Sequence, residues 1–256
     1  MAAGTRRKRA PSQNTRLRNP SQVPLEEKEA PMRPSRAIVA TLALLAVAAP
    51  ASSAATPTIR VETVTRELVP PVTNGSVRSY VDTAGAAHVL APRTALGQIV
   101  ALGARRDVPV TVQFFASFNS GLLQRFGSGR SATGGWQFTV NGVPSQVGAD
   151  SAVVPSGAEV VWWLVDDFGT QGSFLPLDLD LVSKKANGDV RFRVTKFDTA
   201  SGKVIGAKGA ALRVNGHNHT VPASGFVTVH VTPGKRFKAR ATQPSTIRSE
   251  QVSGKA

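Results

Sequence analysis

Two neighbouring stretches, GGWQFTVNGVPSQVGAD at residues 134–150 and SGAEVVWWLVDD at residues 156–167, carry the clearest secondary-structure signals in the chain. The first places a strand directly before Asn141-Gly142, and Asn-Gly is the strongest short hairpin signal because both residues tolerate the positive φ angles of a tight turn. The second reads as a turn at Gly157 followed by a strongly apolar strand. We therefore expect a closing hairpin and a last buried strand of one sheet.

The segments before this hairpin predict further strands and one helix. Residues 58–68 alternate apolar and polar side chains, which is typical of a strand. Thr94 can cap a helix with an apolar stripe, and Gly103 is a plausible end signal for it. The glycine- and serine-rich residues 119–135 read as a long loop. Together these elements predict an α+β unit in which a single helix packs on one mixed sheet.

The pattern changes after residue 176. Residues 177–254 contain short strand-like runs at intervals of about ten residues, which predicts an all-β sandwich. Residues 168–176 would link the two domains.

Several of these segments resemble known families. The set TALGQIVAL, GGWQFTVNG, GAD and SGAEVVWWLVDD is similar to the transcobalamin-like carboxy-terminal domain of many secreted bacterial proteins, most specifically at Gly135-Trp136 and Val140-Asn141-Gly142. That resemblance implies a β-grasp-like fold at residues 58–168 and a role in binding a ligand or partner, with cobalamin as one candidate and no catalytic motif. The run from Lys196 onward resembles carboxypeptidase-regulatory-like and transthyretin-like modules, whose motifs are looser.

The fold class expected from pattern and resemblance is therefore an α+β β-grasp-like domain followed by an all-β sandwich, after an N-terminal signal segment. Residues 32–55 would be that segment, because Arg33 and Arg36 precede an uncharged apolar run and a small-residue stretch that suits cleavage. Residues 1–31 are then a disordered basic tail, or a mis-annotated start if translation begins at Met32. The alternative is a single uncleaved N-terminal membrane anchor. Either interpretation places the bulk of the chain in a secreted or cell-surface location.

The distribution of charge argues against nucleic acid as the partner. The formal net charge is +15, but residues 1–36 carry +6, residues 60–170 are neutral and residues 171–256 carry +9. A nucleic-acid-binding protein concentrates positive charge on its recognition domain, whereas here the best-patterned domain is neutral. The absence of cysteine excludes disulfides and thiolate chemistry.

Three tryptophans and two arginines are candidates for a ligand groove. Trp136, Trp162 and Trp163 can stack on a flat ligand, and Arg125 and Arg130 lie in the glycine-rich stretch that could close over it. Trp162 and Trp163 must point to opposite faces of their strand, so we expect at most one of them in the core. The competing interpretations are burial for the tryptophans and a flexible connection for the loop.

Alternating cations predict a basic sheet face in the second domain. Arg191 and Arg193 share one side of a strand, as do Arg236, Lys238 and Arg240. Such a face can retain a protein on an anionic cell-wall polymer, although solubility alone is the simpler explanation.

The sequence offers no assembly of residues typical of catalysis or of a metal site. There is no nucleophile elbow, the four histidines lack an acid-base context, and the pair His217 and His219 has no neighbouring carboxylate to complete a ligand set. We therefore expect a non-enzymatic secreted or envelope-associated binding protein, with an unknown small-molecule ligand or an extracellular protein as its partner. The alternative is a structural surface or adhesion protein without a small-molecule ligand.

Overall fold

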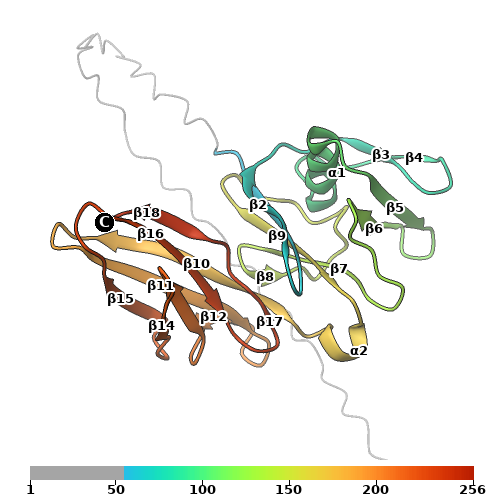
Figure 1. Cartoon of the computed structure of the whole chain (residues 1–256). Helices are drawn as coiled ribbons and strands as arrows, with labels where there is room; N and C mark the ends of the chain where they lie inside the picture. The colour runs from blue at the N-terminus through green and yellow to red at the C-terminus, as the bar shows by residue number, and fades with distance from the viewer. Residues whose placement is uncertain (1–54) are drawn as a thin grey trace, which may run out of the picture. The chain divides into compact units, whose positions relative to one another are not determined.

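A computed structural model describes residues 55–256, and its first half is built on a five-stranded sheet (Figure 1). The strand order is β2-β1-β9-β7-β8. The strands are β1 (Thr58–Thr63), β2 (Glu67–Thr73), β7 (Gly135–Val140), β8 (Val143–Pro144) and β9 (Glu159–Val165). β1 and β9 run parallel, whereas the other neighbours are antiparallel. Residues 1–54, with the predicted tail and nearly all of the predicted signal segment, lie outside the described residues.

Strand β9 lies at the centre of this sheet and is buried on both faces. Six of its seven residues are buried, which explains the near-continuous apolar sequence. The predicted turn between β7 and β8 is confirmed, since Asn141 and Gly142 have φ angles of 51° and 73°. The Asn141 side chain also accepts a hydrogen bond from the backbone N–H of Glu159 at 2.9 Å. The Asn141-Gly142 turn therefore also fixes the position at which β9 begins.

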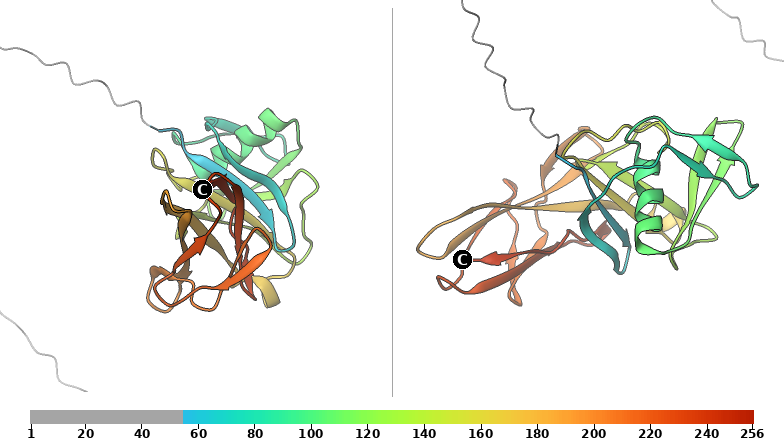
Figure 2. Two further views of the ribbon diagram at one scale, coloured as in Figure 1. Left: turned by 60° about the vertical axis from the view of Figure 1, so that its left-hand side comes forward. Right: turned by 90° about the horizontal axis from the view of Figure 1, so that it is seen from above.

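Helix α1 (Ala95–Arg106) covers one face of the sheet (Figures 1 and 2). Thr94 caps it as expected, because its hydroxyl accepts a hydrogen bond from the N–H of Gly97 at 3.1 Å. The expectation that Gly103 ends the helix is wrong: the helix continues to Arg106, and Asp107 ends it in the left-handed conformation. Gly103 is instead a packing residue, since a Cβ there would collide with Val110.

Two hairpins flank the helix. The first pairs β3 (Ser79–Val81) with β4 (Ala87–Val89), and the second pairs β5 (Val110–Phe115) with β6 (Ser120–Phe126). Strand β6 occupies much of the stretch that was expected to be a loop. That expectation is wrong because the apolar side chains Leu123 and Phe126 are buried between its glycines.

The predicted fold class is therefore wrong in its first part. Strands make up 50% of the described structure and helices 8%, distributed over several small sheets with only α1 and the four-residue α2 (Phe168–Gln171) as helices among residues 55–256. This is a β-sandwich type rather than an α+β β-grasp followed by a sandwich. The sequence interpretation placed the strands of the first half in one mixed sheet under the helix, whereas they form one five-stranded and two two-stranded sheets. Within the described residues, neither helix is long and apolar enough to cross a membrane.

The second half consists of two further sheets that enclose their own core. One has the order β12-β11-β10-β17 with β15 also paired to β11, and the other has the order β14-β13-β16-β18. Phe192 and Phe237 meet edge to face between these sheets, with ring centroids 5.6 Å apart. The strands are β10 (Leu175–Lys184), β11 (Asp189–Asp198), β12 (Lys203–Gly206), β13 (Ala211–Val214), β14 (His217–Thr220), β15 (Phe226–His230), β16 (Arg236–Thr242), β17 (Thr246–Ile247) and β18 (Val252–Lys255).

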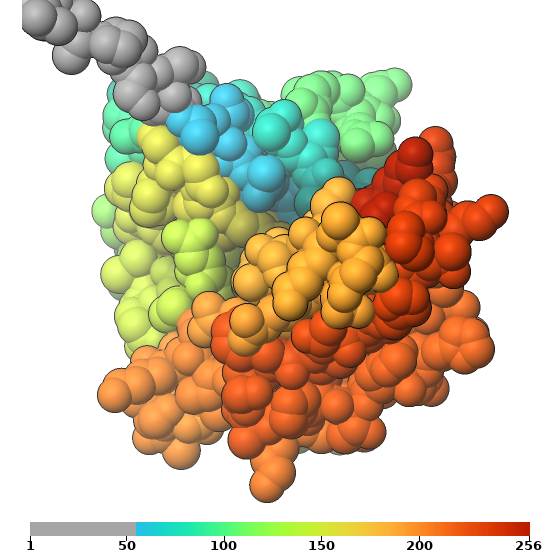
Figure 3. All heavy atoms as spheres, turned by 90° about the vertical axis from the view of Figure 1, so that its left-hand side faces the viewer, coloured from blue at the N-terminus to red at the C-terminus, as the bar shows by residue number. Residues whose placement is uncertain are grey.

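The end of β10 lies beside the last strand. The ammonium group of Lys184 donates a hydrogen bond to the backbone carbonyl of Lys255 at 2.9 Å. Figure 3 shows this side of the molecule, where the gold segment of β10 and β11 adjoins the red C-terminal segment.

The two halves join through a small apolar cluster on the second face of β9. Val161, Trp163 and Val165 pack there against Ile247, with Leu175 at the margin. Trp163 is 1% exposed. Since α1 covers one face of β9 and the second half covers the other, both Trp162 and Trp163 are core residues, and the expectation that at most one would be buried is wrong.

Shortening Trp163 should destabilise the whole chain. Trp163→Ala should lower the free energy of unfolding by about 3–5 kcal/mol, because it removes a large buried side chain and leaves a cavity at the join. Urea unfolding followed by circular dichroism measures the change. Val143→Ala, on the exposed edge strand β8, is the control and should change it by less than about 0.5 kcal/mol. Equal effects of the two substitutions would contradict the assignment of Trp163 to the core.

Candidate functional site

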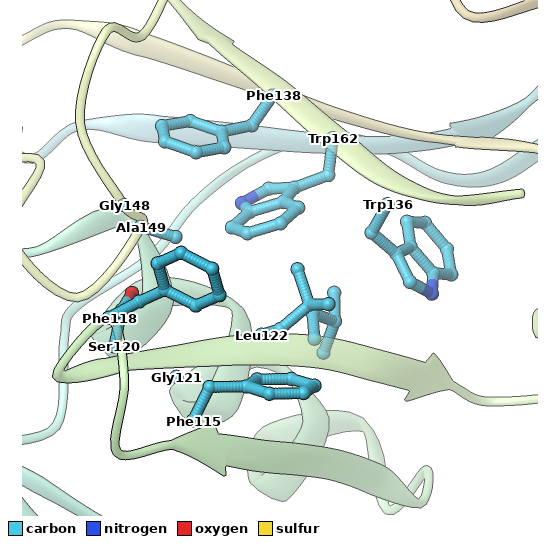
Figure 4. Close-up of a pocket in the computed structure, with 11 residues that line it drawn as sticks. Phe115, Phe118, Ser120, Gly121, Leu122, Trp136, Phe138, Gly148, Ala149 and Trp162 are labelled. Atoms are coloured by element: carbon cyan, nitrogen blue, oxygen red, sulfur yellow. The ribbon is translucent and has the colours of Figure 1, made fainter. Parts of the chain in front are cut away.

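An apolar pocket of about 310 Å³ opens between the five-stranded sheet and the β5–β6 hairpin (Figure 4). Strands β7 and β9 form its floor, the hairpin forms the opposite wall, and the loop after β8 closes one side. The lining residues are Phe115, Phe118, Ser120, Gly121, Leu122, Leu123, Trp136, Phe138, Gly148, Ala149 and Trp162.

Aromatic rings form the floor of the pocket, and the register between β7 and β9 fixes their positions. Phe138 on β7 lies directly opposite Trp162 on β9, and their rings stack with centroids 4.8 Å apart at an interplanar angle of 27°. Trp136 lies two residues before Phe138, so it faces the same side of the sheet. Because β9 is held between β1 and β7, these rings have a rigid support.

The opposite wall is more exposed. Phe118 is 78% exposed at the tip of the hairpin, where its N–H donates a hydrogen bond to the Phe115 carbonyl at 3.1 Å. Leu122, which points toward Trp162 in Figure 4, is 47% exposed. Isolated exposed apolar side chains are common, but several around one pocket form a rim that a ligand or partner would cover.

The loop that closes the pocket is fastened by Asp150. Its carboxylate accepts hydrogen bonds from the Ser120 hydroxyl at 3.1 Å and from the Gly121 N–H at 2.9 Å. A side chain at Gly148 would collide with the Ser120 hydroxyl, so glycine is required for this close approach. The Gly148-Ala149-Asp150 sequence therefore positions one wall of the pocket.

The pocket has little polarity, but two of its lining residues carry an N–H group without a hydrogen-bond partner. Its lining residues, all within the described part of the chain, carry no charge. The indole N–H groups of Trp136 and Trp162 have no hydrogen-bond partner although these residues are 5% and 1% exposed, and the nitrogen of Trp162 lies at the end of its ring nearer Ala149 (Figure 4). An unpartnered buried N–H is costly, so a ligand that brings an acceptor would gain affinity here.

Only two of the five residues that the sequence suggested for ligand binding line the pocket. Trp136 and Trp162 line the pocket, whereas Trp163 faces the join between the halves. Arg125 is half-buried and donates a hydrogen bond to the Gly127 carbonyl at 2.7 Å, while Arg130 is exposed. Neither arginine lines the pocket.

The residues that the sequence interpretation missed come from the hairpin and from the loop after β8. Leu122 lies in the glycine-rich stretch that was expected to close over a ligand, but neither it nor Phe115, Phe118 or Ala149 was singled out as a binding residue. The sequence feature that could have indicated these residues is an aromatic cluster, Phe114-Phe115 and Phe118, beside a glycine-rich stretch. Only the tertiary fold brings this cluster over the tryptophans.

The cations predicted to bind a polyanion lie on two different surfaces. Arg191 and Arg193 are on the outer face of the sheet that contains β11. Arg236, Lys238 and Arg240 are on the outer face of the sheet that contains β16. They do not form one patch.

A second polar feature lies at the join, around the fully buried side chain of Arg60. Its guanidinium is 3.7 Å from a carboxylate oxygen of Glu159 and 3.6 Å from one of Glu250. Asp178 completes a cluster in which one oxygen from each of the three acids lies within 4.8 Å of the others. Because Arg60 already supplies a cation, we assign no metal to this cluster.

Burial dominates the ionisation of these acids. It raises the pKa of Glu250 to about 8, although Arg60 opposes the shift. Burial likewise raises the pKa values of Glu159 and Asp178, again against the effect of Arg60. The neighbouring acids add to the shift, so the cluster holds protons at pH values where exposed carboxyls are ionised.

Comparison with known proteins gives one partial match. A family model described as "Domain of unknown function (DUF4430)" matches residues 121–166. That segment runs from β6 to β9 and includes both tryptophans of the pocket and the loop fastened by Asp150. No curated protein matches the chain significantly, and no solved structure does so.

The raised pKa of Glu250 predicts that stability falls as pH rises. The folded chain retains a proton at Glu250 up to about pH 8, whereas an unfolded glutamate loses it near pH 4.3, so the folded state binds more protons between these values. The free energy of unfolding should therefore decrease from pH 5 to 8, by at most about 1.4 kcal/mol per pH unit for one retained proton.

Glu250→Gln tests this prediction, because glutamine is uncharged and keeps an oxygen that can accept from the Leu179 N–H. Urea unfolding at pH 5, 6, 7 and 8 should show a smaller decrease in the variant. Asp107→Asn, at the exposed end of α1, is the control and should retain the decrease of the parent chain. A parent chain whose stability rises over this range would show that the cluster is ionised.

Proposed function

We propose that this chain is a non-enzymatic binding protein that holds a small, uncharged, mainly apolar ligand between the β5–β6 hairpin and the tryptophan floor. The observation that carries the proposal is the pair of unpartnered indole N–H groups of Trp136 and Trp162 in a pocket whose other lining groups are almost all apolar. Ligand sites combine such apolar walls with a few polar groups that fix orientation.

The size and charge of the pocket limit the ligand. A volume of about 310 Å³ is near the lower end of ligand sites, which start at roughly 300 Å³. It suits a molecule of one or two rings or a short branched chain. A charged ligand would lose its hydration without gaining a counter-ion from the lining residues.

The matched domain supports binding rather than catalysis. Domains of this family are often found in transcobalamin-like proteins, and the resemblance of residues 58–168 to transcobalamin-like domains points the same way. A whole corrinoid is far larger than the pocket, so we do not propose cobalamin as the enclosed ligand. The similarity of the second half to transthyretin-like modules suggests a supporting role.

The place of action is part of the proposal. The apolar run that follows Arg36 suits an export signal, and a chain without cysteine can fold in an oxidising compartment without thiol chemistry. We propose that the protein acts outside the cytoplasm, either secreted or at the cell envelope.

The exposed rim favours a second candidate function. Phe118, Leu122 and the nearby Val147 are exposed by 78%, 47% and 55%. An apolar side chain of a partner protein could enter the pocket while these residues contact its surroundings, as anchor residues do in protein interfaces. The protein would then be a surface or adhesion protein without a small-molecule ligand.

A neutral fluorescent probe tests the pocket. N-phenyl-1-naphthylamine added to the full chain should give a saturable rise in emission. Leu122→Asp should weaken its binding by tenfold or more, because the new charge must be desolvated beside the ligand. Val89→Asp is the matched control, since Val89 is exposed on β4 and does not line the pocket. Saturation lost equally in both variants, or absent from the parent chain, would reject a small-molecule pocket and leave the partner-protein candidate.

The donor of Trp162 predicts a preference among ligands of one shape. 2-Acetylnaphthalene should displace the probe at a concentration about two- to tenfold lower than 2-ethylnaphthalene, because a net hydrogen bond contributes about 0.5–1.5 kcal/mol. Competition titrations measure the ratio. Equal potency would show that the indole N–H does not contact the ligand.

A further inference from the structure

The outer face of the β14-β13-β16-β18 sheet gathers five cations. Phe237, Ala239 and Ala241 of β16 point into the core, so the alternate residues of that strand point outward. Strand register adds one cation from β13 and one from β18 to the same side. We call this set the basic face, and its members are Arg213, Arg236, Lys238, Arg240 and Lys255.

Like charges lie directly opposite each other on this face. Arg213 pairs in register with Arg240, and Arg236 pairs in register with Lys255. Like charges at directly opposed positions of neighbouring strands destabilise a sheet. A sheet that keeps two such pairs leaves a positive potential that an external anion can neutralise.

Little within the described chain neutralises this potential. Glu67 of β2 accepts a hydrogen bond from Arg240 at 2.6 Å. Among residues 55–256, the other four cations of the basic face form no ion pair. The face therefore retains about four uncompensated charges.

The opposite outer face differs, although it also contains two arginines. Arg193 lies in register with Asp180, and Arg191 with the uncharged Ser183. The guanidinium carbons of Arg191 and Arg193 lie 4.2 and 5.7 Å from the ring centroid of Phe226. Both arginines lie over an aromatic ring and one of them lies opposite an acid, so their face is a suitable comparison for the basic face.

The basic face is also hollowed and offers amide groups. A groove of about 400 Å³ is lined by Arg213, Lys238 and Arg240 together with the polar residues Asn215 and Gln251. The Asn215 amide already donates to the Arg236 carbonyl and accepts from the Lys238 N–H, so the three cations and Gln251 are the groups of the hollow that suit phosphate oxygens, which accept several hydrogen bonds at once. The cations of β16 recur every second residue, at about 7 Å, which matches a ligand with repeated anionic groups.

The side chains of the basic face indicate which kind of anionic macromolecule it can bind. The large apolar side chains that are strongly exposed elsewhere in the described chain are absent from this sheet, so it lacks an anchor for a lipid bilayer. Its outward positions on β13, β16 and β18 contain no aromatic ring on which unpaired nucleobases could stack. We propose that the basic face binds a linear phosphodiester polymer without bases or acyl chains, of the poly(glycerol phosphate) type. This inference does not depend on the apolar pocket.

Binding of the full chain to poly(glycerol phosphate) tests the proposal by isothermal titration at 50, 100 and 200 mM NaCl. We expect binding at 50 mM NaCl whose logarithmic affinity falls with log salt with a slope near −3, as about four neutralised charges predict at about −0.7 per charge. Arg236→Gln combined with Lys238→Gln should weaken binding at least tenfold and make the slope shallower by about 1.4.

The matched control is Arg191→Gln combined with Arg193→Gln, which removes the same charge from the opposite outer face. It should change the affinity by less than twofold, and melting temperatures should confirm that both variants fold. Absence of binding at 50 mM NaCl, or equal losses in the two variants, would overturn the proposal. Tighter binding to single-stranded poly(dT) or to phosphatidylglycerol vesicles would also overturn it and identify nucleic acid or a membrane as the target.

Discussion

The buried guanidinium of Arg60 is the constraint on which the rest of this chain depends. Arg60 is fully buried on β1, so its charge must be met by groups that the fold brings to it. Two of those groups lie in the first half, since carboxylate oxygens of Glu62 and Glu159 are 3.4 and 3.7 Å from its guanidinium. The others come from the second half: the carbonyls of Leu177 and Arg248 accept its hydrogen bonds, and Glu250 lies within ion-pair distance. Arg248 in turn donates to Glu62, two residues further along β1. Separating the halves would remove two carbonyl acceptors and Glu250 from Arg60 and would break the Arg248–Glu62 pair, so the first sheet and the second half stabilise each other.

Strand register links the burial of Arg60 to the geometry of the pocket. Arg60 lies opposite Val161 on the parallel neighbour β9, which directs Trp163 toward the join and Trp162 toward the pocket. The floor of the pocket is thus part of the most buried strand of the sheet, whereas its other wall is a two-stranded hairpin that pairs with no other sheet. A fixed aromatic floor reduces the entropy lost on binding, and a separate hairpin can adjust without breaking the ladder of β9.

The sequence predicted features that depend on neighbouring residues. The Asn141-Gly142 turn, the Thr94 cap and most strands of the second half follow from local conformational preferences, and all are present. The α+β class was wrong because the strands were expected to form one mixed sheet under the helix, whereas two hairpins form small sheets of their own, and residues 119–135 were expected to be a loop. Burial of both Trp162 and Trp163 was missed because a strand sequence shows that its faces differ, but not that each face is covered by a different part of the chain. The pocket was only half predicted for the same reason, since its tryptophans lie near a recognisable turn, whereas Phe115 and Phe118 lie on the separate β5–β6 hairpin.

The two proposed sites would bind their ligands through different physical interactions. The pocket lies in the half whose charges balance and is lined by uncharged residues, so affinity there depends on apolar area and the indole N–H groups and should respond little to salt. The basic face lies in the half with a net charge of +9, and the sheet keeps like charges opposed across its strands, so affinity there must fall steeply as salt rises. A chain that concentrates its charge on one sheet and keeps it out of its pocket can hold a neutral ligand and a polyanion at once without competition between them.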